Sequence, residues 1–280
     1  MSNRVCLGKL CGRLSFILCL SSTLRLLCSH ARALGTLQSS SSHLAHLDMS
    51  RNNLLDMDSP ALCESLRDNQ YLETLRLCDN RLGDTSGIRF GQLLVTNRQL
   101  LELDLSGNCI RSIGGVALGK GLQESTKIQR LSLSRNGLEN AVATSLANAL
   151  RVNTSLRELR LDHNHIRPNG AIALAGGLAA NTTLVLFDIA HNPIGHDGLR
   201  AILEVLRTHP SLANVNFDGI PLNSENRKLL EEIVKSKSVR ARRGHVPHTH
   251  THTCTHHHHH HSKYGAYPFD RLARSAGSQG

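Results

Sequence analysis

The sequence predicts an α/β solenoid, a leucine-rich-repeat horseshoe with short parallel strands on a concave face and helices on a convex face. Two observations predict it. Apolar residues recur with a strict 28-residue period, and every period contains a strand-like half followed by a helix-like half. A period kept over seven units indicates stacked copies of one structural unit that bury their apolar faces against each other. The units begin at Leu44, Leu72, Leu100, Ile128, Leu156, Leu184 and Leu212.

The strand-like half is clearest in the stretch LRELRLDHNHI, which spans Leu156–Ile166. Alternate residues such as Leu159 and Leu161 should point into the core, so we expect strands at Leu75–Leu77, Leu131–Leu133 and the equivalent positions. An asparagine occupies the ninth position of the first six units. We expect its amide to be buried where the chain turns and to bond backbone groups that no neighbouring strand reaches. These residues are Asn52, Asn80, Asn108, Asn136, Asn164 and Asn192.

The helix-like half has apolar residues at i, i+3 and i+4, and many alanines and glycines that allow close helix packing. Two asparagines, Asn153 and Asn181, begin N-glycosylation sequons just before the next strand. We interpret them as helix ends rather than as glycan sites. The expected helices include Gly114–Leu122, Ala141–Leu150, Gly170–Leu178 and Gly198–Leu206.

These motifs resemble the ribonuclease-inhibitor-like class of leucine-rich-repeat proteins. The resemblance rests on the L-x-x-L-x-L-x-x-N-x-I half, on the helix motif at Gly170–Leu178, and on the N-x-S/T-L segments Asn153–Leu156 and Asn181–Leu184. The class includes ribonuclease inhibitor, NOD-like receptor sensor regions, the Ran GTPase-activating protein and many small cytoplasmic animal proteins made of little else. The chain is most similar to the last group. The resemblance specifies the fold, whereas the function depends on the surface residues.

The two ends of the chain do not fit the repeat. Residues 1–43 combine basic residues, a short apolar run at Phe16–Leu20 and Ser-rich sequence, which we interpret as a divergent N-terminal leader or cap. A mitochondrial or secretory targeting segment is the alternative. The leucine-rich-repeat domain spans residues 44–234, and its seventh unit is a C-terminal cap with Ile220 in place of the asparagine and a charged helix from Glu225 to about Lys235.

Residues 235–280 form a basic, His-rich tail that we expect to be disordered. His256–His261 is an unbroken histidine run preceded by His-Thr alternation. Such a tract can bind zinc, nickel or copper, but no tetrahedral ligand spacing is present. His-Thr alternation is also what a translated CA dinucleotide repeat encodes, and we favour that origin over a metal site.

The net charge of +10 belongs to the ends of the chain. Residues 44–234 carry 19 basic and 21 acidic residues, so we do not expect this domain to bind nucleic acid. Only three of the eight cysteines lie in the repeats and none forms a CxxC pair, which favours free thiols and a cytoplasmic location. No stretch is long and apolar enough to span a membrane.

Charged residues at the third and fifth positions of each unit should form ladders across the concave face. The predicted ladders are Asp48–Arg76–Asp104, Glu102–Arg130–Glu158 and Arg160–Asp188, each ion pair contributing about 0–1 kcal/mol. Ladders of this kind neutralise themselves and can also bind a charged partner, with Arg76, Arg130 and Arg160 as anchors. The predicted partner-binding residues are Arg76, Glu102, Asp104, Arg130, Glu158, Arg160, Asp162, His163 and Asp188.

The sequence therefore predicts a non-catalytic scaffold that presents its concave face to a protein partner. Phosphate-loop, zinc-protease and serine-hydrolase motifs are absent from the sequence, and we expect no cofactor, no metal and no small-molecule substrate. His163 and His191 lie near Asp162 and Asp188 in the ladders, but an open sheet does not exclude water as acid–base catalysis requires. The alternative function, implied by the resemblance, is regulation of a GTPase or of an immune-type signalling complex.

Overall fold

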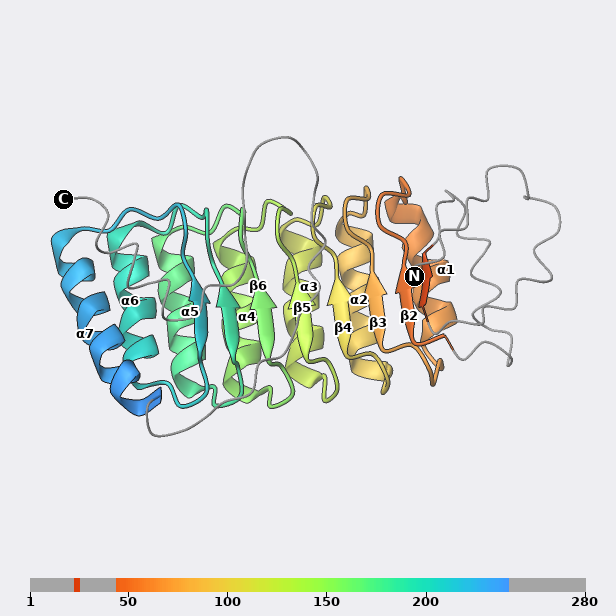
Figure 1. Ribbon diagram of the computed structural model, residues 1–280. Coiled ribbons are helices and arrows are strands. Elements are labelled where there is room, and N and C mark those ends of the chain that lie inside the picture. The colour runs from red at the N-terminus through yellow and green to blue at the C-terminus, as the bar shows by residue number, and fades with distance from the viewer. Residues whose placement is uncertain (1–22, 26–43, 242–280) are drawn as a thin grey trace.

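The computed structural model describes residues 23–25 and 44–241, which form a single row of stacked strand–helix units (Figure 1). Eight parallel strands form one sheet in the order β1 to β8, so every strand pairs with its neighbour in the sequence. This arrangement confirms the predicted α/β solenoid. The strands are β1 Thr23–Arg25, β2 His46–Asp48, β3 Thr74–Arg76, β4 Glu102–Asp104, β5 Arg130–Ser132, β6 Glu158–Arg160, β7 Leu186–Asp188 and β8 Asn214–Asn216.

Strand β1 adds a strand at the N-terminal edge of the sheet, where the repeat register gives none. Leu24 pairs with Leu47, and Leu47 pairs with Leu75, so the first step along the chain is shorter than the repeat period. The shorter step explains why Leu24 does not lie at the strand position that the period predicts. The rest of that segment and the tail from residue 242 lie outside the described residues, and the predicted domain boundaries remain predictions.

The helices lie on one side of the sheet (Figure 1). The four helices predicted by sequence are confirmed, and each is a few residues longer than its apolar motif. The last helix continues past the expected end near Lys235, because neither glycine nor proline interrupts the chain between Pro221 and Gly244. The helices are α1 Ser59–Leu66, α2 Asp84–Thr96, α3 Ser112–Glu124, α4 Asn140–Val152, α5 Pro168–Ala180, α6 Gly195–Thr208 and α7 Ser224–Ala241, with a short 3-10 helix, η2, at Asp56–Asp58.

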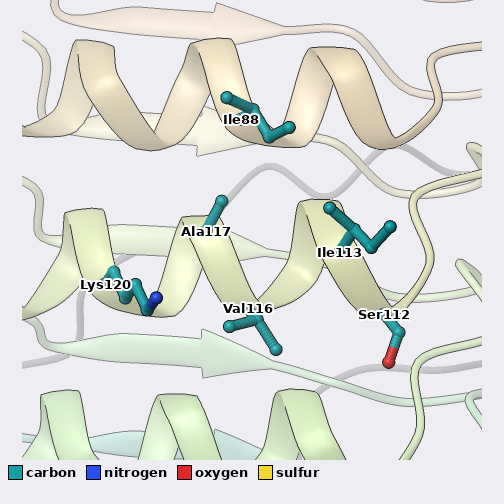
Figure 2. A pocket seen from close by; sticks show the side chains of 6 residues that line it. All are labelled: Ile88, Ser112, Ile113, Val116, Ala117 and Lys120. Atoms are coloured by element: carbon teal, nitrogen blue, oxygen red, sulfur yellow. The ribbon is translucent and has the colours of Figure 1, made fainter.

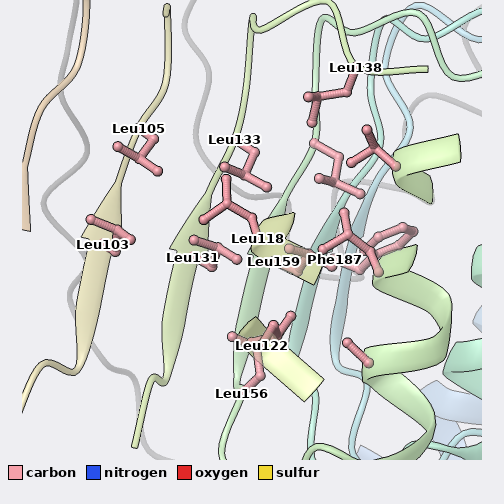
Figure 3. Packing of buried hydrophobic residues seen from close by; sticks show 14 of the residues in the cluster. Leu103, Leu105, Leu118, Leu122, Leu131, Leu133, Leu138, Leu156, Leu159 and Phe187 are labelled. Atoms are coloured by element: carbon pink, nitrogen blue, oxygen red, sulfur yellow. The ribbon is translucent and has the colours of Figure 1, made fainter. Parts of the chain in front are cut away.

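The core is a continuous column of leucines between the sheet and the helices. Each strand contributes its middle residue, such as Leu103, Leu131 and Leu159, and each helix contributes residues such as Leu118 and Leu122 (Figure 3). All five side chains are at most 1% exposed. Because each unit buries its apolar face only against its neighbours, the fold has the one-dimensional character of a solenoid.

The predicted asparagine ladder is confirmed, and it explains why the strands are so short. Asn164 Oδ1 accepts hydrogen bonds from the backbone N–H groups of Asn136 and Leu138, both at 3.0 Å. Its Nδ2 donates to the carbonyls of Leu133 at 3.1 Å and Leu161 at 2.8 Å. The amide thus bonds the carbonyls of the first residue after each strand. The observed strands end one residue earlier than predicted.

A second row of asparagines lies directly after the C-terminal ends of helices, as at Asn153 and Asn181. Asn153 follows α4 and is 4% exposed. Its Nδ2 donates to the carbonyls of Leu122 and Ser125, and its Oδ1 accepts from the N–H groups of Ser155 and Leu156. The residue is extended rather than left-handed. Because both Nδ2 hydrogens are used inside the protein, the interpretation as a helix end holds over a glycan in the folded state.

Glycines bring neighbouring helices into direct backbone contact. A Cβ atom at Gly121 of α3 would lie 2.1 Å from the carbonyl oxygen of Gly91 in α2, and one at Gly177 of α5 would lie 2.5 Å from that of Ala147 in α4. Only glycine fits at such positions, so the contact distance between these helices depends on them.

Asn164→Ala should lower the free energy of unfolding by about 2–4 kcal/mol, because it leaves several buried backbone groups without hydrogen bonds. Asn169→Ala, an exposed position in α5, serves as the control and should change it by less than about 0.5 kcal/mol. Chemical denaturation measures both. Equal effects of the two substitutions would show that the ladder does not stabilise the fold.

Two adjacent glycines of α5 should respond to alanine with opposite signs. Gly177→Ala should destabilise the protein by about 1–3 kcal/mol, because the new Cβ meets backbone of α4. Gly176→Ala meets only the flexible end of Arg151, and the gain in helix propensity should stabilise the protein by about 0.5–1 kcal/mol. Thermal unfolding of the two variants gives the comparison, and destabilisation of similar size in both would contradict it.

Candidate protein-binding surface

The strand register places the predicted ladder residues next to one another on the concave face. In β2, β4, β5, β6 and β8 the middle residue is buried and the residues on either side of it are partly exposed. The order of side chains along the face is as predicted, while their role in binding stays a prediction. The register pairs include Arg76 with Asp104, Glu102 with Arg130, and Arg160 with Asp188.

Glu102 lies at the centre of the N-terminal half of the face. Its Oε1 accepts from Arg76 Nε at 3.1 Å, and its Oε2 accepts from Arg130 Nε at 2.9 Å. The Glu102–Arg130 pair is the predicted lateral one, whereas the diagonal pair with Arg76 was not predicted. Asp104, the predicted partner of Arg76, accepts from the thiol of Cys78 and from the N–H of Ser106.

A further row of side chains follows the strands at the eighth position of each unit, and its conformation was not predicted. Every described unit has a left-handed residue there, with φ between +53° and +73°. Glycine occupies the row at Gly107, where a Cβ would lie 2.1 Å from Asp79 Oδ1. Since Gly107 has no side chain, Arg135 of the next unit can reach Asp79 of the unit before, and Arg135 Nη1 lies 3.1 Å from Asp79 Oδ1. Arg51 Nε lies 3.5 Å from Asp79 Oδ2, so this carboxylate also binds two arginines.

Arg160 is the least available of the three predicted anchors. Its side chain is 19% exposed, and its Nη2 lies 3.4 Å from Glu158 Oε2 within the same strand. This short-range contact replaces two predicted lateral pairs, Arg160 with Asp188 and Arg130 with Glu158, since Arg130 is bonded to Glu102 instead. Arg130 and Arg135 are more accessible, with side chains 36% and 40% exposed.

The histidines pack against each other at the same edge. His163 and His191 stack with ring centroids 4.2 Å apart, and both lie in the left-handed row. His163 Nδ1 lies 2.9 Å from Asp162 Oδ2, and Asp162 also accepts a hydrogen bond from the hydroxyl of Ser134. Burial, and then the neighbouring His163, lowers the pKa of His191.

Asp188 is the most deeply buried carboxylate among the predicted site residues, with 7% of its surface exposed. Its Oδ1 accepts from the N–H of Ala190 at 3.1 Å and its Oδ2 from Asn216 Nδ2 at 3.0 Å. Burial, and then the negative charge of Asp162, raises the pKa of Asp188 to about 6. This side chain is therefore charged at neutral pH at the expense of stability.

A metal site and an acid–base site at the histidines were also considered for the part of the chain that the structure describes. No group of three or more His, Cys, Asp or Glu side chains there is placed to hold a metal ion. The His-rich tract lies outside this part. The stacked histidines lie in the turns after β6 and β7, where the side chain of His163 is 45% exposed to water.

The convex face carries a shallow apolar hollow between α2 and α3 (Figure 2). Ile113 is 67% exposed there, and Lys120 is the only ionisable residue lining it. The hollow thus lacks an acid–base pair.

Of the helices described, none could cross a membrane.

The raised pKa of Asp188 leads to a prediction about stability. Because the folded protein holds this proton more tightly than the unfolded chain, the contribution of Asp188 to stability falls as the pH rises from about 4 to about 6. Asp188→Asn should therefore raise the free energy of unfolding by about 1–3 kcal/mol near pH 7.5 and have little effect near pH 4.

Urea unfolding at the two pH values measures this effect. Asp104→Asn, at the equivalent position of β4, is the control and should not stabilise the protein near pH 7.5, because that carboxylate is less buried. A destabilised Asp188→Asn protein near pH 7.5 would contradict the prediction.

Comparison with protein families identifies the repeat independently. A model described as Leucine Rich repeat matches residues 68–91, 96–119, 152–175 and 180–203. The first and second matches begin one repeat period apart, and so do the third and fourth. A search of the curated proteins finds no significant match.

Solved structures with detectable similarity include the C-terminal domain of tropomodulin from Caenorhabditis elegans, with 20% identity, coverage of 47% of this chain and 81% of that chain, and a TM-score of 0.41. Another is the leiomodin-1 actin-binding site 2, with 13% identity, coverage of 75% and 90%, and a TM-score of 0.37. A pollen receptor kinase 3 shares 20% identity over 63% of this chain and 74% of that chain, with a TM-score of 0.38. The period, the asparagine ladder and the four family matches agree that this chain contains leucine-rich repeats.

Proposed function

We propose that this protein is a non-catalytic scaffold that binds a protein partner on its concave face. The observation that supports this proposal most directly is the set of partly exposed arginines and carboxylates that the strand register aligns across the face. Such a face offers guanidinium and carboxylate groups in fixed positions, which suits recognition of a charged protein surface.

The geometry of the arginines supports their proposed role as anchors. Arg76 and Arg130 are both oriented by Glu102, so less side-chain entropy is lost when they bind a partner. Arg135, oriented by Asp79, extends the same surface along the edge of the sheet. Aromatic anchors are absent from the exposed strand positions of the described units, which favours a salt-sensitive contact of moderate affinity.

The alternative function is regulation of a GTPase or of an immune-type signalling complex, which would also act through protein contacts. A GTP-hydrolysis screen with small GTPases distinguishes the two, because a scaffold leaves the hydrolysis rate unchanged. The predicted cytoplasmic location is part of the proposal, and the free thiols of Cys63, Cys78 and Cys109 support it.

Replacement of Arg76, Arg130 and Arg160 by alanine should reduce the recovery of bound partners at least about tenfold, since arginine anchors often contribute about 2 kcal/mol or more to binding. Quantitative mass spectrometry of proteins cross-linked to the full chain provides the measurement. The control removes the same charge from exposed helix positions, with Arg89, Arg151 and Arg200 replaced by alanine. An unchanged partner set in the concave variant would refute the proposal.

A further inference from the structure

No described helix covers the concave side of the sheet, although Thr74, Leu186 and Asp188 on that side are buried. All described helices lie behind the strands, on the other side of the sheet (Figure 1). The face divides into an N-terminal half, formed by β2 to β5 and the turns that follow them, and a C-terminal half, formed by β6 to β8 and the turns that follow them. The two halves differ in charge, which bears on what each could bind.

Charge is balanced in the N-terminal half and unbalanced in the C-terminal half. The N-terminal half carries Arg51, Arg76, Arg130 and Arg135 against Asp48, Asp79, Glu102 and Asp104. The C-terminal half carries four carboxylates and one arginine: Glu158, Asp162, Asp188 and Asp218 against Arg160.

The two halves also differ in how their charges are paired. In the N-terminal half, Glu102 and Asp79 each contact two arginines. In the C-terminal half, the single arginine is bound by Glu158. Among residues 44–236, whose side chains are described, no arginine or lysine forms an ion pair with Asp162, Asp188 or Asp218.

These three carboxylates belong to consecutive units and share one surface. Asp188 lies on β7, where its Oδ2 accepts from Asn216 of β8, and the turns after β6 and β8 carry Asp162 and Asp218. Asp162 and Asp188 are close enough to repel each other, as the raised pKa of Asp188 shows. A bound cation would relieve that repulsion, whereas a bound anion would increase it.

We propose that the C-terminal half of the concave face binds a basic segment of a protein partner, whose arginine or lysine side chains contact the partly exposed Asp162 and Asp218, while the buried Asp188 adds negative charge to the same surface. This inference rests on the proposed function and adds the chemistry of the partner. The excess of negative charge is specific to this half, because the N-terminal half has as many arginines as carboxylates and pairs Glu102 and Asp79 with arginines of the chain itself.

The surroundings of these groups give the binding a defined pH dependence. Asp188 is faced by Asp162 and Arg160 and bonded by Asn216, and His191 is faced by His163, Asp162 and Asp218. Lowering the pH protonates Asp188 and removes its negative charge. This change weakens attraction for a cation, so binding should be tighter near pH 7.5 than near pH 5.5.

Fluorescence anisotropy with the full chain and a labelled peptide of five Arg-Gly repeats tests the inference, with five Glu-Gly repeats as the opposite probe. The test variant carries Asp162→Asn, Asp188→Asn and Asp218→Asn. The control removes the same charge from exposed helix positions, with Glu124→Gln, Asp197→Asn and Glu231→Gln. We expect at least tenfold weaker binding of the Arg-Gly probe by the test variant and less than a threefold change in the control.

Because Asp188 is buried, the single variant Asp218→Asn, at a partly exposed position, provides a second measurement and should weaken binding about threefold. Equal losses in test and control variants, or binding of the Glu-Gly probe in preference to the Arg-Gly probe, would overturn the inference. If the concave arginine variant still loses its partners in that case, the proposed function stands and only the chemistry of the partner is wrong.

Discussion

The hydrogen bonds of the asparagine ladder are the constraint on which the rest of the structure depends. From Asn80 to Asn192, each ladder amide bonds backbone groups of its own unit and of the unit before it, as Asn164 does with Leu161 and Leu133. It thereby supplies hydrogen-bond partners to buried backbone N–H and C=O groups that lie beyond the ends of the short strands. Because the same bonds recur in successive units, they fix the register of the strands. The ladder ends where Ile220 replaces the asparagine, and there the charged helix α7 packs against α6.

The ladder and the glycine contacts divide the residues of each unit by role. Leucines, ladder asparagines and glycines such as Gly121 and Gly177 are fixed by packing, since any change meets backbone or leaves a buried group unpaired. The third and fifth positions differ from unit to unit, because their side chains lie on the concave side of the sheet and not in the leucine core. Function in this fold therefore depends on the residues between the structural ones.

The sequence was sufficient to predict the fold and the order of side chains along the face, because both follow from the repeat period. The diagonal ion pair could not be predicted, since Arg76 is long enough to reach either Asp104 or Glu102, and the outcome depends on side-chain conformation. The left-handed row was missed, although its signal is visible in the sequence. Gly107 and Gly219 both occupy the eighth position, directly before the asparagine position. The other units have Arg, Asp or His at the eighth position. Strand β1 was missed because the step from β1 to β2 is shorter than the period.

The raised pKa of Asp188 bears on why the C-terminal half of the face keeps its carboxylates. A charged group buried at the fifth position without an ion-pair partner costs stability, and asparagine occupies that position in the next unit, at Asn216, without that cost. Asp188 accepts a hydrogen bond from the N–H of Ala190, and Asn216 accepts the equivalent bond from Asp218, so the fold uses the acceptor at this position and not its negative charge. The proposed basic partner would give that charge a role. The same reasoning does not extend to Glu102, whose two arginines already account for its charge. The unequal pairing of the two halves therefore distinguishes carboxylates that arginines of the chain neutralise, Glu102 and Asp79, from those that the proposed basic partner would neutralise.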